Sequence, residues 1–327
     1  MKTLRFISAF TILAYCFTVM LYSCKQKNEE YPPRIWSEYA YTSSTIAYRD
    51  ISALFIENEH STWLGSKGNE GLLYNDGYKW TVFEKSNTGI NFDSITAITR
   101  DGNGILWVSW NGGLATFDGN QWNENSLFKG LCVTSIAVAG IGNIIAGING
   151  EKGGIAELQN NEWTFYTLSN SEIPSGKINS LASDHKQALW LATADNGIVK
   201  FDNNKWDIIS DSIPLLSSDF TKIMTATDGS IWAGSVASQL TQFYNNTSTL
   251  FYTGVSKPIT SLVEAGEGSM WCSTFGAGII KFDGINWTSF TKDNAALPTN
   301  DIITMVKNST GIMFFSIPGG KVLMLKP

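Results

Sequence analysis

The sequence predicts an all-β fold, a seven-bladed β-propeller with four antiparallel strands in each blade, from three observations. A short motif recurs seven times at spacings of 38 to 45 residues, a period typical of propeller blades. The chain contains 30 glycines and 12 tryptophans, and most of the tryptophans keep a fixed place in the repeat. The last repeat has three strands, and a matching fourth strand lies near the N-terminus.

Each repeat begins with a short strand, here called strand a, whose first and fourth residues are apolar. The residues between them are mostly small or polar, which suits a strand at the crowded centre of a propeller. The seven copies lie at residues 51–54, 95–98, 133–136, 178–181, 220–223, 259–262 and 302–305.

Two aromatic anchors follow strand a and predict the other strands of each blade. The first anchor, on strand b, is Trp63, Trp107, Ile145, Trp190, Trp232, Trp271 or Phe314. The motif Gly-apolar-x-x-Phe-Asp-Gly predicts strand c and has clear copies at residues 113–119 and 278–284. The second anchor starts strand d and is Trp80, Trp122, Trp163, Trp206, Leu250 or Trp287. We expect these aromatic side chains to pack between neighbouring blades.

The seventh repeat, residues 301–327, supplies strands a, b and c without a strand d. Residues 34–39 look like the missing strand, with Trp36 in the place of the second anchor. The N-terminal strand is therefore predicted to complete the last blade. Such a closure pairs an edge that would otherwise be open to other chains.

The first 33 residues predict an export signal and a tether. Lys2 and Arg5 precede an apolar run at residues 6–20, which is short for a membrane span. Residues 21–24 then match a bacterial lipobox that ends in Cys24. We expect a signal peptide at residues 1–23, lipidation of Cys24, a polar tether at residues 24–33 and the propeller at residues 34–327. The alternative is an ordinary signal peptide with an incidental cysteine. The expected location is the bacterial cell envelope, at the outer membrane or cell surface.

Four motifs resemble the two-component regulator propeller repeat: apolar-x-Ser-Leu, Asp-x-x-Gly-x-x-Trp, Gly-Ile-x-x-Phe-Asp and Trp-Thr-x-Phe. The resemblance covers residues 34–327 and implies a propeller like those of periplasmic sensor regions and free-standing lipoproteins. Streptogramin lyases resemble these repeats more distantly. Two departures are local: blade three has Ile145 for the first tryptophan, and blade five has Gln239 for the glycine of strand c.

Candidate binding residues lie in the loops between strands b and c, on the face that propellers commonly use for ligands. Trp110 is the one tryptophan outside the two anchors, so an exposed ring at a loop tip could stack on a sugar or insert into a partner. The alternative is that Trp110 folds back onto its own blade. The other candidates in these loops are Asn111, Phe275, Asp195, Asn196 and Lys67.

Charged residues at the start of strand a are expected to surround the mouth of the central channel. Their mixed signs could orient a polar ligand, or they could form a solvated rim. They are Arg49, Asp50, Asp93, Lys177, Asp219, Lys257 and Asp301. Among them, Arg49 is a candidate ligand-binding residue.

The remaining chemistry-bearing residues exclude several classes of function. His60 and His185 are expected in the a–b turns, on the opposite face, so no histidine is expected at the channel mouth. No nucleophile motif or metal-ligand spacing occurs, so no catalytic residue, metal or cofactor is predicted. The net charge is −6 with no basic run, which argues against a nucleic-acid partner. Cys132 and Cys272 are expected as unpaired residues in apolar surroundings.

The sequence thus favours a membrane-anchored, non-enzymatic binding propeller whose loop face recognises a glycan or an envelope protein. A sensory role follows only from the family resemblance. Two alternatives are a propeller enzyme of lyase or hydrolase type and a scaffold within an envelope complex. The enzyme would need converging acid or base groups at the mouth, and the scaffold would need a large flat apolar patch.

Overall fold

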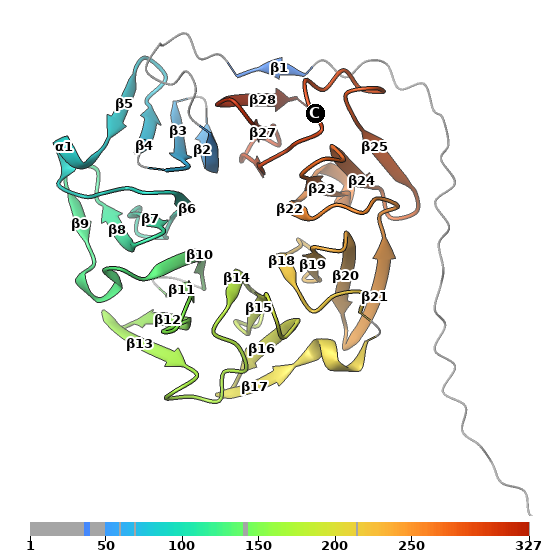
Figure 1. The fold of residues 1–327 in the computed structure, drawn as a ribbon, viewed down its shortest axis with the longest axis horizontal. Helices are drawn as coiled ribbons and strands as arrows, with labels where there is room; N and C mark the ends of the chain where they lie inside the picture. The colour runs from blue at the N-terminus through green and yellow to red at the C-terminus, as the bar shows by residue number, and fades with distance from the viewer. Residues whose placement is uncertain are drawn as a thin grey trace, which may run out of the picture.

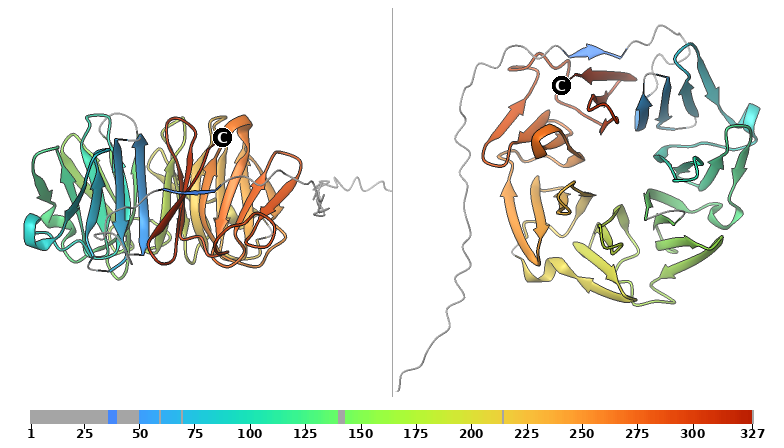
Figure 2. Two further views of the ribbon diagram at one scale, coloured as in Figure 1. Left: turned by 90° about the horizontal axis from the view of Figure 1, so that it is seen from above. Right: turned by 180° about the vertical axis from the view of Figure 1, so that it is seen from behind.

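The computed structural model describes residues 36–39, 50–58, 60–68, 70–139, 143–213 and 215–326. The predicted signal peptide, the whole predicted tether with Cys24, and Arg49 lie outside these described residues. Seven four-stranded antiparallel sheets stand around a common centre (Figure 1). Seen from the side, the sheets form a disc with loops on both faces (Figure 2). The predicted seven-bladed propeller is therefore confirmed.

Strand a of each blade lies nearest the centre, and strands b, c and d follow outward, in chain order in six blades and with β1 as the outermost strand of the seventh (Figure 1). The a strands are β2 (Ile51–Asn58), β6 (Ile95–Arg100), β10 (Cys132–Val138), β14 (Ile178–Ser183), β18 (Phe220–Thr225), β22 (Ile259–Glu264) and β26 (Thr304–Lys307). The b strands are β3 (Ser61–Ser66), β7 (Leu106–Trp110), β11 (Ile144–Asn149), β15 (Leu189–Thr193), β19 (Ile231–Ser235), β23 (Met270–Thr274) and β27 (Met313–Ile317).

The c strands are β4 (Leu72–Asn75), β8 (Gly113–Phe117), β12 (Gly154–Gln159), β16 (Ile198–Asp202), β20 (Gln239–Tyr244), β24 (Ile279–Phe282) and β28 (Lys321–Leu325). The d strands are β5 (Trp80–Phe83), β9 (Trp122–Glu124), β13 (Glu162–Thr167), β17 (Lys205–Ile208), β21 (Thr247–Tyr252), β25 (Trp287–Phe290) and β1 (Ser37–Glu38). Short helices interrupt some of the loops: α1 (Lys85–Thr88), η1 (Ser126–Phe128), η2 (Ile209–Ser212) and η3 (Gly266–Gly268). Within the described ranges, none of the helices has the length and apolarity needed to span a bilayer.

The seventh strand a starts two residues later than the sequence predicts. β26 begins at Thr304. The Ile302 amide donates to the Thr274 carbonyl of the neighbouring blade at 3.0 Å, and the Ile303 amide donates to the Ser316 carbonyl of its own blade at 2.9 Å. The other six a strands begin at the predicted residue or one residue before it.

The last blade is completed by the N-terminal strand, as predicted. β1 pairs antiparallel with β28, with Ser37 opposite Met324 and Glu38 opposite Leu323. Trp36 fixes this strand from its inner side: its ring lies edge-on to Phe315 at 5.3 Å, and its Nε1 donates to the Ala295 carbonyl at 2.7 Å. The described part of this strand is shorter than the predicted one, since it starts at Trp36.

The core lies between the blades, where the anchor tryptophans pack. Trp63 of blade one is 2% exposed, stacks on Tyr74 at 4.2 Å and meets the edge of Trp122 in blade two at 6.3 Å. Burial of one such ring contributes a few kcal/mol, roughly 25 cal/mol for each Å² of apolar surface removed from water. The anchors are therefore inter-blade packing residues, as predicted.

A ring of hydrogen bonds joins the a strands around the channel. In six blades the second residue of strand a sits at a β-bulge and donates its side chain to the first carbonyl of the next blade's strand a. The donors are Ser52, Thr96, Thr134, Asn179, Thr221 and Thr260. In blade seven the second residue is Ile303, and Ser316 of strand b supplies the hydroxyl instead, donating to Ile51 at 2.9 Å.

Candidate ligand-binding face

One face of the disc carries all the connections that the sequence singled out. In an antiparallel blade, the b–c loops and the d–a connections emerge from the same end of the sheet. The b–c loops are residues 67–71, 111–112, 150–153, 194–197, 236–238, 275–278 and 318–320. We call this surface the loop face. The opposite face carries the a–b turns, which hold His60 and His185 as predicted.

Trp110 is not an exposed loop-tip residue, which corrects the sequence-based hypothesis for this position. It is the last residue of β7, is 3% exposed and meets the edge of Phe92 at 5.3 Å. Its ring lies over the following glycines: a Cβ on Gly113 would come within 2.5 Å of Trp110 Cζ2. Because these glycines have no side chain, the ring folds back onto its own blade. Trp110 is therefore a packing residue.

Asn111 and Lys67 lie on the surface of the loop face, and the backbone amide of each makes a hydrogen bond within the protein. The Asn111 amide donates to the Asp93 carbonyl at 3.1 Å, and the Lys67 amide donates to the Asp50 carbonyl at 2.8 Å. Both residues are exposed. The Asp50 carboxylate accepts a bond from the Gly319 amide at 2.9 Å, so it helps to join blade one to blade seven.

The predicted residues Asp195 and Asn196 lie in a polar cluster between blades four and five. Asp195 Oδ1 accepts from the Ser175 hydroxyl at 2.6 Å, and its Oδ2 lies 3.2 Å from Lys177 Nζ. Asn196 Nδ2 donates to the Pro174 carbonyl at 2.9 Å. The structure thus brings two candidates from a b–c loop next to a lysine that the sequence placed at the channel mouth.

Asp219 extends this cluster across the blade boundary. Asn179 Nδ2 of blade four lies 3.3 Å from Asp219 Oδ1 of blade five, and the same amide nitrogen donates to the Phe220 carbonyl at 2.8 Å. We call the set Ser175, Lys177, Asn179, Asp195, Asn196 and Asp219 the blade four–five cluster. It joins the loop face to the inner wall of the channel.

The two carboxyl groups of this cluster have pKa values displaced in opposite directions. Desolvation acts to raise the pKa of Asp195, but the hydrogen bonds from Ser175 and Lys177 and the charge of Lys177 outweigh it, so the pKa lies below its ordinary value. Desolvation raises the pKa of Asp219, and the charge of Asp195 adds to this rise against the hydrogen bond from Asn179. Asp219 therefore holds its proton to higher pH than Asp195.

Phe275 is the predicted aromatic candidate that the structure leaves exposed. It lies in the b–c loop of blade six and is 50% exposed. Two backbone bonds hold the loop: the Phe275 amide donates to the Pro258 carbonyl at 3.4 Å, and the Gly276 amide donates to the Asn300 carbonyl at 3.0 Å. The stem of Lys257 lies against Gly276, since a Cβ there would be 3.2 Å from Lys257 Cε. A flat apolar ring thus stands beside a flexible cation.

Three exposed leucines on the same face were not predicted. They lie in the d–a connections after blades two, three and four, and each is 58% to 62% exposed. They are Leu127, Leu168 and Leu216. The same connections also hold buried apolar residues such as Phe128 and Ile173, so the sequence carries no signal that marks these three leucines as exposed.

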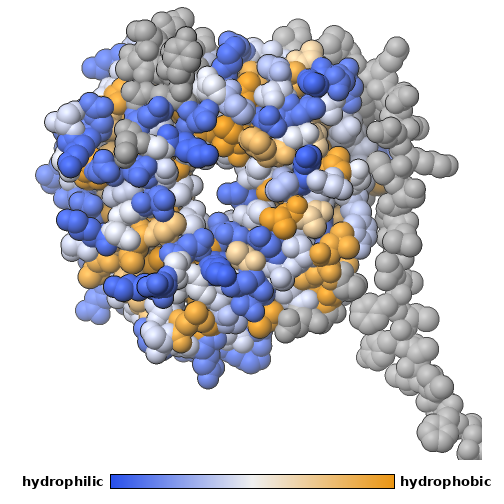
Figure 3. Space-filling view, in the orientation of Figure 1, coloured by the Kyte–Doolittle hydropathy of each residue, from blue (hydrophilic) through white to orange (hydrophobic). Residues whose placement is uncertain are grey.

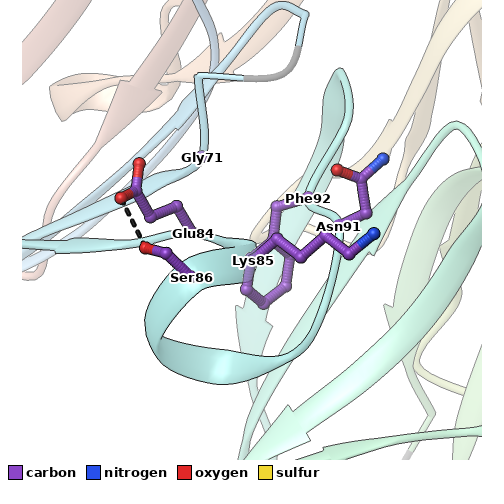
Figure 4. Close-up of a pocket in the computed structure, with 6 residues that line it drawn as sticks. All are labelled: Gly71, Glu84, Lys85, Ser86, Asn91 and Phe92. Carbon is purple, nitrogen blue, oxygen red and sulfur yellow. Dashed lines mark hydrogen bonds between the residues drawn. The ribbon is translucent and has the colours of Figure 1, made fainter.

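A small pocket lies on the loop face between blades one and two. It has a volume of about 220 Å³ and is lined by Gly71, Glu84, Lys85, Ser86, Asn91 and Phe92. Figure 4 shows Glu84 and Ser86 on one side of the pocket and Asn91 with Phe92 on the other. Glu84 accepts a bond from the Ser86 hydroxyl at 2.7 Å. Sequence reasoning did not find this pocket, because its walls come from the b–c loop and the d–a connection together.

The chain is thus a seven-bladed β-propeller whose loop face carries an exposed aromatic ring and a polar cluster. No protein-family model and no curated protein sequence matches it. Solved structures match its fold. The extracellular domain of the one-component system BT4673 from B. thetaiotaomicron has a TM-score of 0.73 and 18% identity over 89% of this chain. That of the hybrid two-component system BT3049, from the same organism, has a TM-score of 0.74 and 17% identity over 91% of this chain.

Lyases share this fold as well. An inactive variant of virginiamycin B lyase from Staphylococcus aureus, solved with quinupristin, has a TM-score of 0.74 and 13% identity, covering 90% of this chain and 99% of the lyase. This chain spans only 40% and 41% of the two B. thetaiotaomicron domains. At these identities the comparisons establish a common fold.

Proposed function

We propose that this protein is a non-enzymatic binding propeller, displayed from the bacterial envelope through lipid on Cys24, whose loop face recognises a glycan in a sensory role. The observation that carries the proposal is the exposed Phe275 ring on the same face as the blade four–five cluster. The similar solved domains from B. thetaiotaomicron are extracellular parts of one- and two-component systems, which supports an envelope location.

The chemistry of the face suits a sugar. A half-exposed aromatic ring can stack on the C–H face of a pyranose, and such a ring keeps little conformational freedom to lose on binding. The carboxylate of Asp195 and the ammonium of Lys177 can accept and donate hydrogen bonds to sugar hydroxyls. These groups are already held by Ser175 and by each other, so little ordering is needed on binding.

The test is a glycan array followed by titration of the best ligand with matched variants. We expect Phe275→Ala to weaken binding at least tenfold. Tyr78→Ala is the control, because Tyr78 is 91% exposed but lies in a c–d turn on the opposite face. Equal binding by Phe275→Ala and the native protein would remove the loop face of blade six from the proposal.

A protein partner is the second candidate, and the exposed leucines favour it. Leu127, Leu168 and Leu216 follow three successive blades on the loop face. Exposed apolar side chains that gather on one face are typical of a docking surface. We expect a triple Leu→Ser variant to lose a protein partner in pull-down from the envelope fraction. Ile285→Ser is the control, since Ile285 is 73% exposed in a c–d turn on the other face. Retention of the partner by the triple variant would contradict this candidate.

An acid–base enzyme is a third candidate, and one observation favours it. Two carboxyl groups whose pKa values are displaced in opposite directions, Asp195 and Asp219, belong to the same cluster. If the protein cleaves the glycan that it binds, Asp219→Asn should abolish product formation while binding persists. Intact glycan after prolonged incubation with the native protein would exclude this activity for that ligand.

A further inference from the structure

Blade five departs from the other blades at one position of its innermost strand. The third residue of strand a is small in six blades, where it is Ala53, Ala97, Ser135, Ser180, Ser261 or Thr304. In blade five it is Lys222, on β18. The a strands surround the channel (Figure 1), which opens through the centre of the molecule (Figure 3). Lys222 is therefore the one cationic residue at this position of the inner strands, where the other six blades have alanine, serine or threonine.

Two of the serines at this position accept a bond from the next blade. Ser180 Oγ of blade four accepts a bond from the Ile223 amide of blade five at 3.3 Å. Ser261 Oγ of blade six accepts one from the Met305 amide of blade seven at 3.1 Å. In both cases the donor is the amide of the fourth residue of the next strand a. At these two steps the third residue is an acceptor between adjacent blades, whereas Ala53 and Ala97 have no polar side-chain atom and Ser135 Oγ has no hydrogen-bond partner among the described residues.

Lys222 holds the corresponding place between blades five and six. The equivalent amide on the next strand a, β22, belongs to Leu262. An ammonium group has three donors and no acceptor, so Lys222 cannot accept a bond from that amide. A cationic side chain thus takes the place that an accepting serine holds at two other steps. A cation beside a backbone amide is suited to an anion.

Among the residues that the structure describes, no hydrogen bond or ion pair neutralises the Lys222 ammonium. Asp219 precedes it at the channel mouth and faces Asn179. Glu264, at the end of β22, accepts from Thr227, and Lys177 of blade four pairs with Asp195. Lys257, before β22, is a further cation. The surrounding strands desolvate the Lys222 ammonium and lower its pKa.

We propose that Lys222 and the Leu262 amide form an oxyanion site inside the channel, which binds one carboxylate, phosphate or sulfate group of a small ligand. A charge-assisted bond from the ammonium and a second bond from the amide would satisfy both donors at once. The site is distinct from the Phe275 surface, because it lies on the inner strands. It can therefore be present whether or not the loop face binds a glycan.

The test uses simple anions as probes. The melting temperature of the native protein is measured in potassium acetate, phosphate or sulfate against potassium chloride of equal ionic strength. We expect at least one oxyanion to raise it by several degrees, because a ligand that binds only the folded state stabilises it. Lys222→Met should lose the shift, and Lys257→Met, which removes an exposed lysine on the loop face, should keep it.

A second readout is independent of stability. The Lys222 side-chain resonance, assigned by its loss in Lys222→Met, is titrated with pH by NMR in chloride and in the active oxyanion. Bound anion should raise the pKa of Lys222, since a neighbouring negative charge favours the ammonium. If Lys222→Met does not fold, Lys222→Gln replaces it. An oxyanion response that survives in the Lys222 variant, or the absence of any response in the native protein, would overturn the proposal.

Discussion

The Ser316 hydroxyl donates to the Ile51 carbonyl at 2.9 Å and so joins the last blade to the first. Both residues are fully buried. At the other six boundaries the bond comes from the second residue of strand a, but that position in blade seven holds Ile303, which has no donor in its side chain. Ser316 thus replaces a missing donor from a different strand of the same blade. The ring closes chemically at the same place where the N-terminal strand closes it topologically.

Ser316→Ala should lower the free energy of unfolding by about 1–3 kcal/mol, because it leaves the buried Ile51 carbonyl without this donor. Urea unfolding measures the difference. Ser109→Ala is the control: Ser109 holds the equivalent place in blade two, but there the Val133 carbonyl receives its bond from Thr96. A cost for Ser316→Ala no larger than that of Ser109→Ala would show that the Ser316 bond has no special role in closure.

Trp36 supplies the second part of the closure. Trp36→Ala should lower the free energy of unfolding by about 2–3 kcal/mol, since it removes a partly buried ring from Phe290 and Phe315 and its bond to Ala295. Trp36→Phe retains a ring but no N–H, so it should cost less. Limited proteolysis should also cut the N-terminal segment faster in Trp36→Ala. Unchanged stability of Trp36→Ala would mean that β1 contributes little to holding blade seven.

The blade number and the split blade could be predicted because the packing residues recur with the period of the fold. The first anchor, which is Trp63 in blade one, is buried at the corresponding position of every blade for the same reason, so one copy informs the others. Features that break the period were harder to predict. Trp110 folds back because Gly113 leaves room for its ring, and no repeat pattern reports that space.

The hydrogen bonds between the a strands and the position of Lys222 are also features that the sequence alone did not predict. Thr221 and Lys222 are adjacent in the sequence, yet the Thr221 hydroxyl donates to the next blade while the Lys222 ammonium has no polar partner among the described residues. The β-bulge after Phe220 separates the two roles, and bulges follow from pairing between strands. The sequence does show that Lys222 is unlike its counterparts. The structure adds that this third residue of strand a lies beside the strand a of the next blade.

Lipidation of Cys24 remains a prediction from the sequence. Cys24→Ala should remain unlabelled when cells that express the protein receive a radioactive or alkyne-tagged fatty acid, while the native protein is labelled. The variant should also leave the membrane fraction, because stable anchoring depends on the acyl chains. Cys16→Ala is the matched control, since Cys16 lies in the apolar run of the signal peptide. Labelling of Cys24→Ala would contradict the lipobox interpretation.

Lys222→Met should raise the free energy of unfolding near neutral pH. The unfolded chain holds the proton of a lysine up to its ordinary pKa of 10.5, whereas burial makes the folded protein release it at lower pH. Between those two values the unfolded state binds more protons, so the stability contributed by this group rises with pH. Each unit of lowering corresponds to about 1.4 kcal/mol. The advantage of Lys222→Met should therefore be largest below the folded pKa and should shrink as the pH approaches 10.5.

Denaturant unfolding of both proteins from pH 7 to pH 11 in chloride measures this difference. Lys257→Met, at an exposed lysine, should show no such trend. If Lys222→Met is less stable than the native protein at pH 7, the ammonium is compensated in the folded state. Lys222 would then be a structural residue, and the channel would hold no free cation for an anion to bind.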